Sequence, residues 1–160
     1  MTDPSQKLLE LLHHPLKSRL YLLWKIPSAF FSGVRMEYAD ETKAMVSIPY
    51  RWFSSNPFNS IYFACLSMAA ELSTGILAML PLYEQTPALS MLITKTEGQF
   101  HKKAKGLVTF TCEDGLIIKQ CVKEAMTSGK TTSIAARSIG KDAAGNVVAT
   151  FVFTWSFRIK

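Results

Sequence analysis

One stretch of this chain limits its fold more than any other: residues 61–80 are apolar, small or weakly polar except for a single charge, Glu71, near the middle. A helix that is hydrophobic on every side must be covered on most sides. A carboxylate in such a helix loses hydration worth several kcal/mol unless it is paired, hydrogen-bonded or protonated. Glu71 is therefore either a buried group satisfied by a neighbour or a candidate catalytic acid or base.

The same stretch is about as long as a helix that spans a bilayer. It carries Glu71 centrally, Ser67, Ser73 and Thr74 nearby, and no basic flank that would orient it. An acidic residue at the centre of a spanning helix costs about 2.5–3.5 kcal/mol on insertion scales. We therefore expect a core helix that other elements wrap.

The first thirty residues predict two helices. Asp3 is suited to the N-cap of the first and Pro4 to its first turn, while Pro15 restarts the chain and Pro27 ends the second helix. The second helix carries an apolar stripe flanked by basic residues; the stripe consists of Leu16, Leu20, Leu23 and Trp24. We prefer to interpret the stripe as a packing surface and do not expect membrane contact, the alternative being a membrane-surface anchor.

The next segments read as a strand and a loop. Residues 35–50 alternate as one strand, and residues 51–59 form a loop rich in Ser, Asn and Pro. Asn59 or Ser60 is available as the N-cap of the apolar helix.

The second half of the chain alternates strands with one helix. Residues 88–103 are extended, and residues 107–112 are predicted to be their hairpin partner. An amphipathic helix opens at Glu113 and Asp114 and closes at Gly129. Residues 130–139 and the strongly alternating residues 147–159 form a hairpin across Gly145.

This order of elements predicts an α+β fold. A chain of 160 residues with 48% hydrophobic and 19% charged residues fits one globular domain, residues 1–160, with residues 1–30 as an N-terminal helical extension. One very apolar helix among about five to six strands suggests an antiparallel sheet wrapped around that helix.

Charge and cysteine content narrow the partners and the compartment. The net charge of +6 favours an anionic partner, but no nucleic-acid-binding motif accompanies it, and we expect none. Three isolated cysteines, Cys65, Cys112 and Cys121, read as reduced core thiols. The first residues lack the features of a signal peptide, so we expect a cytoplasmic location, and no spacing of ligands predicts a metal site.

Glu71 shares its helix face with small residues. At offsets of three, four and seven positions lie Ala64, Ser67, Thr74, Gly75 and Ala78. Such a stripe leaves room for another backbone or for a ligand.

The string NPFNSIYFAC from Asn56 to Cys65, followed by Glu71 in MAAELSTG, resembles the hot-dog-fold thioesterases. It resembles in particular the PaaI-like branch and an uncharacterised relative with extra N-terminal helices. Members carry an Asn in the loop, often a His and a Gly at the start of the central helix, and an Asp or Glu nine residues after that His. Tyr62 stands here at the His position and Phe63 at the Gly position.

The resemblance implies hydrolysis of an acyl thioester at the start of the central helix. Backbone N–H groups around Tyr62, Phe63 and Ala64 would polarise the carbonyl, Glu71 would activate a water as general base, and Asn56 would orient it. Further substrate-binding residues would be Asn59, Ser60, Ser67 and Gly75, and Lys102 and Lys103 would meet the phosphates of Coenzyme A.

The resemblance also implies an acyl-CoA or acyl-carrier-protein thioester as substrate, no cofactor beyond the Coenzyme A of that substrate, and a homodimer or tetramer with sites across the interface. Uncovered aromatics such as Phe151 and Phe153 are a further reason to expect pairing. Because Tyr62 and Phe63 depart from the catalytic pattern, the alternative is a non-catalytic hot-dog protein that binds acyl-CoA or lipid.

Overall fold

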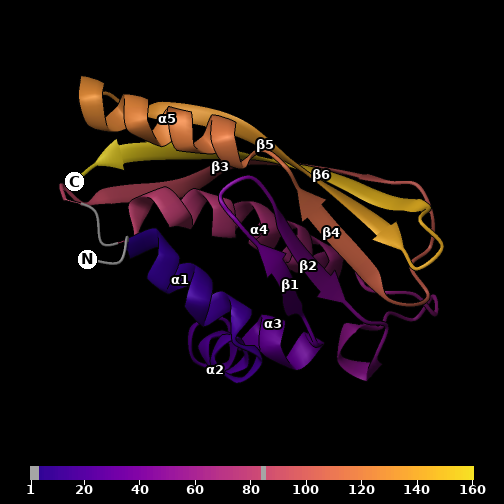
Figure 1. The fold of residues 1–160 in the computed structure, drawn as a ribbon. Helices are drawn as coiled ribbons and strands as arrows, with labels where there is room; N and C mark the ends of the chain where they lie inside the picture. Colours follow the sequence, from indigo (N-terminus) through magenta and orange to yellow (C-terminus); the bar gives the residue numbers. More distant parts are fainter. Residues whose placement is uncertain (1–3, 84–85) are drawn as a thin grey trace.

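The computed structural model describes residues 4–83 and 86–160, which form one antiparallel sheet with helices (Figure 1). The helices are α1 (Pro4–His13), α2 (Pro15–Lys25), α3 (Pro27–Ser32), α4 (Phe63–Met79) and α5 (Gly115–Ser128), with short 3-10 turns η1 (Trp52–Ser54) and η2 (Leu80–Leu82). The strands are β1 (Arg35–Ala39), β2 (Ala44–Ile48), β3 (Leu89–Phe100), β4 (Val108–Cys112), β5 (Thr132–Asp142) and β6 (Val147–Ile159). Their order in the sheet is β1-β2-β4-β5-β6-β3.

The apolar helix α4 lies in the core, as expected. It packs on β2, β4, β5 and β6, and its run Phe63–Leu82, although long and apolar enough to cross a membrane, is mostly buried inside the protein. The alternation of β6 places Phe151, Phe153, Trp155 and Phe157 against this core. Phe151 and Phe153 are thus covered within one chain, so the expectation that they need a partner for cover was wrong.

Two polar contacts fix α4 against the sheet. The hydroxyls of Ser73 and Ser138 lie 2.7 Å apart, and both side chains are fully buried. The indole Nε1–H of Trp155 donates to Thr74 Oγ1 at 3.0 Å. Buried polar groups paired in this way define the rotation of the helix, because any other rotation would leave them without partners.

Helix α5 packs on the same face of the sheet as α4. The Thr132 hydroxyl bonds to the carbonyl of Cys121 in α5, while Ser138 of the same strand face bonds to α4. The helix ends at Gly129, whose φ of 68° is the left-handed conformation expected at a helix end. This helix and the β5–β6 hairpin across Gly145 confirm their predictions.

Three sequence predictions about the strands and α4 were wrong in detail. Residues 35–50 form two strands, because Asp40 accepts hydrogen bonds from the backbone of Thr42 and Lys43 and closes a tight turn. Residues 107–112 do not pair with residues 88–103: β3 pairs with β6, and β4 lies between β2 and β5. The N-cap of α4 is Tyr62 and not Asn59 or Ser60, since those two residues belong to a turn that ends before the helix.

The N-terminal extension differs from expectation in two ways. Helix α2 ends at Lys25, just before Pro27 as predicted, but Pro27 also begins a further short helix, α3, which is closed by Gly33 at φ 87°. The apolar stripe of α2 does not pack inward, because Leu16, Leu20, Leu23 and Trp24 are all exposed, whereas Leu22 is buried. The predicted N-cap Asp3 lies outside the described residues.

Candidate functional site

A pocket of about 510 Å³ lies at the N-terminus of α4 and gathers most of the predicted site residues. Asn56, Ser60, Tyr62, Phe63, Lys102 and Lys103 all line it. The remaining wall comes from Phe58, Phe100 and His101, among others. The loop before α4 and the loop after β3 meet here because Ile61 N–H donates to the carbonyl of Ala104 at 2.8 Å.

Asn56 holds the shape of this pocket. Its Oδ1 accepts from the N–H of Phe58 at 3.0 Å and from both the N–H and the hydroxyl of Ser60, and its Nδ2 donates to Ile61 O at 3.4 Å. Asn59, at φ 55°, occupies the tip of the resulting turn. Both ends of the Asn56 amide are thus used by the loop, and its assignment to a catalytic water stays a prediction.

The start of α4 presents free backbone donors to the pocket. Within the described part of the chain, the N–H groups of Phe63 and Ala64 have no acceptor, and Tyr62 supplies no side-chain cap. Such unpaired groups, together with the helix dipole, favour negative charge on a ligand oxygen. The rings of Tyr62 and Phe63 are 46% and 56% exposed, so aromatic surface surrounds these donors.

Glu71 lies in a second, small cavity of about 90 Å³ under the N-terminal helices. Leu12, Tyr21 and Ile26 close it from the extension, and Met36, Met79 and Met91 contribute to its walls. No donor in residues 4–83 or 86–160 bonds to the Glu71 carboxylate, and burial raises its pKa above the ordinary value. A carboxylate with a raised pKa and no partner has the character of a general base.

Gly75 allows this arrangement. A Cβ on Gly75 would lie 3.1 Å from Glu71 Oε1 and 3.6 Å from the Trp155 ring, so the absence of a side chain lets the carboxylate fold over the helix. The prediction that Glu71 sits beside small residues is confirmed at this position.

One chain does not bring Glu71 to the free donors of α4. Glu71 follows Phe63 by eight positions, which corresponds to about 12 Å along a helix axis. Ala64, Ser67 and Glu71 form a half-exposed line between the two cavities. The donors and the carboxylate of one chain thus line two separate cavities.

The lysines differ in their surroundings. Lys102 forms an ion pair with Asp142 at 2.8 Å, which lowers the pKa of that carboxyl to about 2, whereas Lys103 is exposed. His101 and Phe100 also line the pocket, and sequence reasoning missed both of them because a His in a short Lys run carries no signal of its own.

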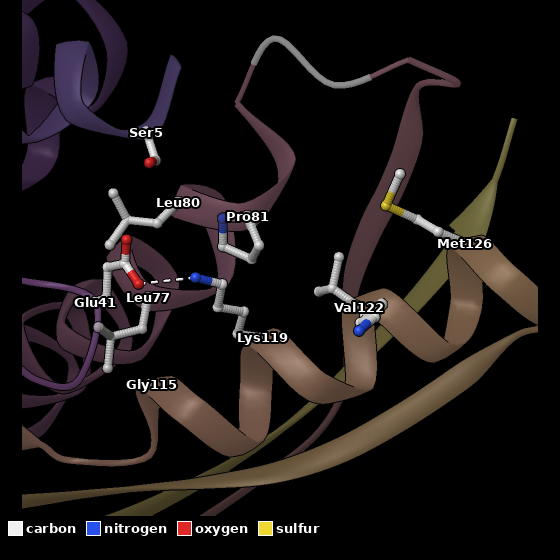
Figure 2. A pocket seen from close by; sticks show the side chains of 10 residues that line it. Ser5, Glu41, Leu77, Leu80, Pro81, Gly115, Lys119, Val122 and Met126 are labelled. Atoms are coloured by element: carbon white, nitrogen blue, oxygen red, sulfur yellow. Dashed lines mark hydrogen bonds and ion pairs between the residues drawn. The ribbon is translucent and has the colours of Figure 1, made fainter. Parts of the chain in front are cut away.

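A third cavity lies between α5, the end of α4 and the start of α1 (Figure 2). Leu77, Leu80, Val122 and Met126 make it apolar, and Lys119 bonds to Glu41 at 2.7 Å at its side. It is a well-formed pocket but contains none of the predicted site residues, so we assign the site to the pocket at the start of α4.

Comparison with known proteins supports the fold. No protein-family model matches the chain, and no curated protein matches its sequence. Among solved structures, it is similar to a probable thioesterase of unknown function from Pseudomonas aeruginosa, with a TM-score of 0.77 and 23% identity over 91% of this chain and 97% of that one. A protein of unknown function from Chlorobaculum tepidum gives a TM-score of 0.74 at 14% identity, covering 98% and 94%.

A mutant thioesterase from Pseudomonas aeruginosa gives a TM-score of 0.69 at 14% identity, covering 91% of this chain and 94% of that chain. The likeness extends over nearly the whole length of each protein, and it includes the antiparallel sheet around a central helix. The chain therefore has the hot-dog fold, with an N-terminal helical extension.

Proposed function

We propose that this protein is a thioester hydrolase that acts on acyl-CoA or on an acyl carrier protein thioester. The observation that carries the proposal is a pair of groups on α4: unpaired N–H donors at its start and, two turns later, a half-buried carboxylate to which no described residue donates a hydrogen bond. The thioesterase neighbours of the same fold support the reaction class. The proposal also includes a cytoplasmic location and no cofactor beyond the Coenzyme A that the substrate itself carries.

The reaction would use the two groups in trans. The thioester oxygen accepts hydrogen bonds from the N–H groups of Phe63 and Ala64 in one chain, which stabilise the negative charge of the tetrahedral intermediate. Glu71 of a second chain takes a proton from water as the water attacks the carbonyl carbon, and the C–S bond then breaks as this proton passes to the departing thiolate. Lys102 and Lys103 lie at the pocket wall, where phosphates of the carrier would be attracted.

Two substitutions test this chemistry. Glu71→Gln removes the base and is expected to lower kcat by about 10²- to 10⁴-fold on a panel of acyl-CoAs. Phe63→Pro deletes one N–H at the first helical position, which tolerates proline, and Tyr62 already has the ψ of 135° that a following proline needs. Its kcat should fall by about 10²- to 10³-fold.

Phe63→Ala is the matched control, because it removes the ring but keeps the N–H. We expect it to retain most of the activity. If the wild-type protein hydrolyses no acyl-CoA of any chain length, the enzyme assignment is wrong. If Glu71→Gln hydrolyses acyl-CoA at the wild-type rate, Glu71 is not the general base.

A non-catalytic acyl-binding protein is the second candidate, and the exposed rings of Tyr62 and Phe63 favour it because they narrow access to the donors. It predicts tight binding of acyl-CoA without turnover, which calorimetry with the same panel distinguishes.

A further inference from the structure

The N-terminal extension exposes an apolar face that nothing in the described chain covers. Leu16, Leu20, Leu23 and Trp24 point outward from α2, and Leu20 and Trp24 are 64% and 82% exposed. Their spacing of four, three and one positions places them on one side of the helix.

The face continues onto α3 and η1. Phe31, Trp52 and Phe53 are each more than half exposed, with the Phe31 and Phe53 rings stacked at 5.8 Å and the Trp52 and Phe53 rings in contact at 4.9 Å. Helices α2 and α3 lie together along one edge of the molecule, on the far side of the central helix from α5 (Figure 1). We call these residues of α2, α3 and η1 the apolar face.

Three arginines lie beside the apolar face around the turn at Gly33. Arg19 donates to the carbonyl of Val34 at 3.1 Å and lies 4.1 Å above the Phe30 ring. Arg51 approaches Gly33 at 3.7 Å, measured from its Cδ to a Cβ built there, and Arg35 directly follows Val34. None of the three forms an ion pair within the described residues, and Arg35 and Arg51 act on Arg19 as like charges.

The net positive charge of the protein comes from the two segments of sequence that contain this face. Residues 11–36 and 42–70, which include α2, α3 and η1, contain six Lys and Arg residues and no Asp or Glu. The rest of the chain holds twelve residues of each sign and is neutral, so the net charge of +6 arises entirely from these two segments.

We propose that the apolar face docks on an anionic lipid bilayer. Leu, Trp and Phe side chains with a basic surround are the composition that binds the interface of a membrane, where apolar groups enter the acyl boundary and cations meet lipid phosphates. A second copy of the chain is a poor occupant, because a symmetric contact would bring two such positive faces together.

Docking there would place the pocket next to the bilayer. η1 leads directly into the pocket loop, and the N–H of Tyr62 donates to the carbonyl of Ser54 at 2.7 Å. Exposed Phe58 extends the aromatic surface from η1 to the pocket. Membrane binding does not depend on hydrolysis, so this proposal and the proposed function can fail separately.

Co-sedimentation with vesicles tests the proposal. We expect the full chain to pellet with vesicles of phosphatidylcholine and phosphatidylglycerol at low salt, and to be released at high salt or with phosphatidylcholine alone. Leu20→Glu and Arg51→Glu should each lower the partition coefficient by about tenfold. Tryptophan fluorescence should shift to the blue on binding, and Trp24→Phe and Trp52→Phe should each remove part of that shift, because both indoles lie on the apolar face while Trp155 is buried throughout.

The controls lie on α5. Leu116→Glu changes a leucine of matching exposure, 62%, and Lys123→Glu changes an exposed cation, and neither should alter binding. Circular dichroism checks that each variant folds. If Leu20→Glu does not fold, Trp24→Ser replaces it as the test of the apolar face. Absence of pelleting with anionic vesicles at low salt, or equal losses in the α5 controls, overturns the proposal. The proposal is also overturned if Leu20→Glu converts a dimer to a monomer and leaves vesicle binding unchanged. That result would show that the apolar face is an interface between two copies of the chain.

Discussion

Glu71 destabilises the folded chain when it is ionised, since burial raises its pKa above the ordinary value of 4.5. The folded state therefore prefers the protonated acid. Its stabilising contribution is complete below about pH 4.5 and is lost as pH rises through the higher folded-state pKa. At neutral pH Glu71 therefore lowers the stability of the folded chain, as expected for a residue retained for its function.

Glu71→Gln should consequently raise the melting temperature at neutral pH, because the raised pKa of Glu71 costs the wild-type folded state stability there. The difference between the two proteins should shrink on acidification and vanish only below pH 4.5, the ordinary pKa of the unfolded-state carboxyl. Thermal melts across this range measure it. A gap that is constant with pH would show that Glu71 is not the titrating group.

The sequence singled out Glu71 as an isolated charge but did not predict its surroundings. An isolated charge in an apolar run is visible in one segment, whereas the cavity walls come from Leu12, Tyr21, Ile26 and Met91, which are distant in sequence. Sequence reasoning placed Asn56 in the loop before the central helix, where the structure has it. Its several hydrogen bonds within that loop depend on a turn that the residues alone did not define.

At the scale of elements, close packing between strands is sensitive to single atoms. A Cβ on Gly140 of β5 would lie 2.5 Å from Cε1 of Phe110, a fully buried ring on β4. Gly140→Ala should lower the free energy of unfolding by about 1–3 kcal/mol, because the ring cannot move aside. Gly106→Ala is the control: nothing lies within 4 Å of a Cβ there, and its effect should stay within about 0.5 kcal/mol. Urea denaturation compares them, and equal losses would contradict this packing.

Elements were predicted better than their pairings. The helix α4 and strand β6 follow from composition and alternation, which are local. The sequence did not predict the pairing of β3 with β6, because residues 88–112 resemble a hairpin locally. The pairing depends on eleven residue pairs between strands that are distant in sequence. The exposed stripe of α2 was misread for the same reason: periodicity identifies an apolar side but not whether anything covers it.

At the scale of the molecule, strand β3 is left uncovered in a single chain. It lies at the edge of the sheet, and every residue from 94 to 100 is exposed, on both strand faces. Long open edges of this kind pair with other strands. Together with the separation of Glu71 from the start of α4, this leads us to expect a homodimer of twice 17.9 kDa with shared sites.

Mixing two inactive variants tests the shared site. In a dimer of Glu71→Gln with Phe63→Pro, one site holds both substitutions and the other holds neither. Subunit exchange should restore about a quarter of wild-type activity, because about half of the dimers are mixed and each has one intact site. Recovery of no activity, with exchange verified by mass spectrometry, would place both groups of a site in one chain.

The N-terminal helices close the Glu71 cavity through Leu12, Tyr21 and Ile26, and this affects how the protein can be divided. A chain cut to the sheet and its central helix would lose these walls, which would hydrate the carboxylate and return its pKa towards the ordinary value. The extension thus helps to set the acidity of Glu71, and its loss would convert the proposed base into a surface glutamate.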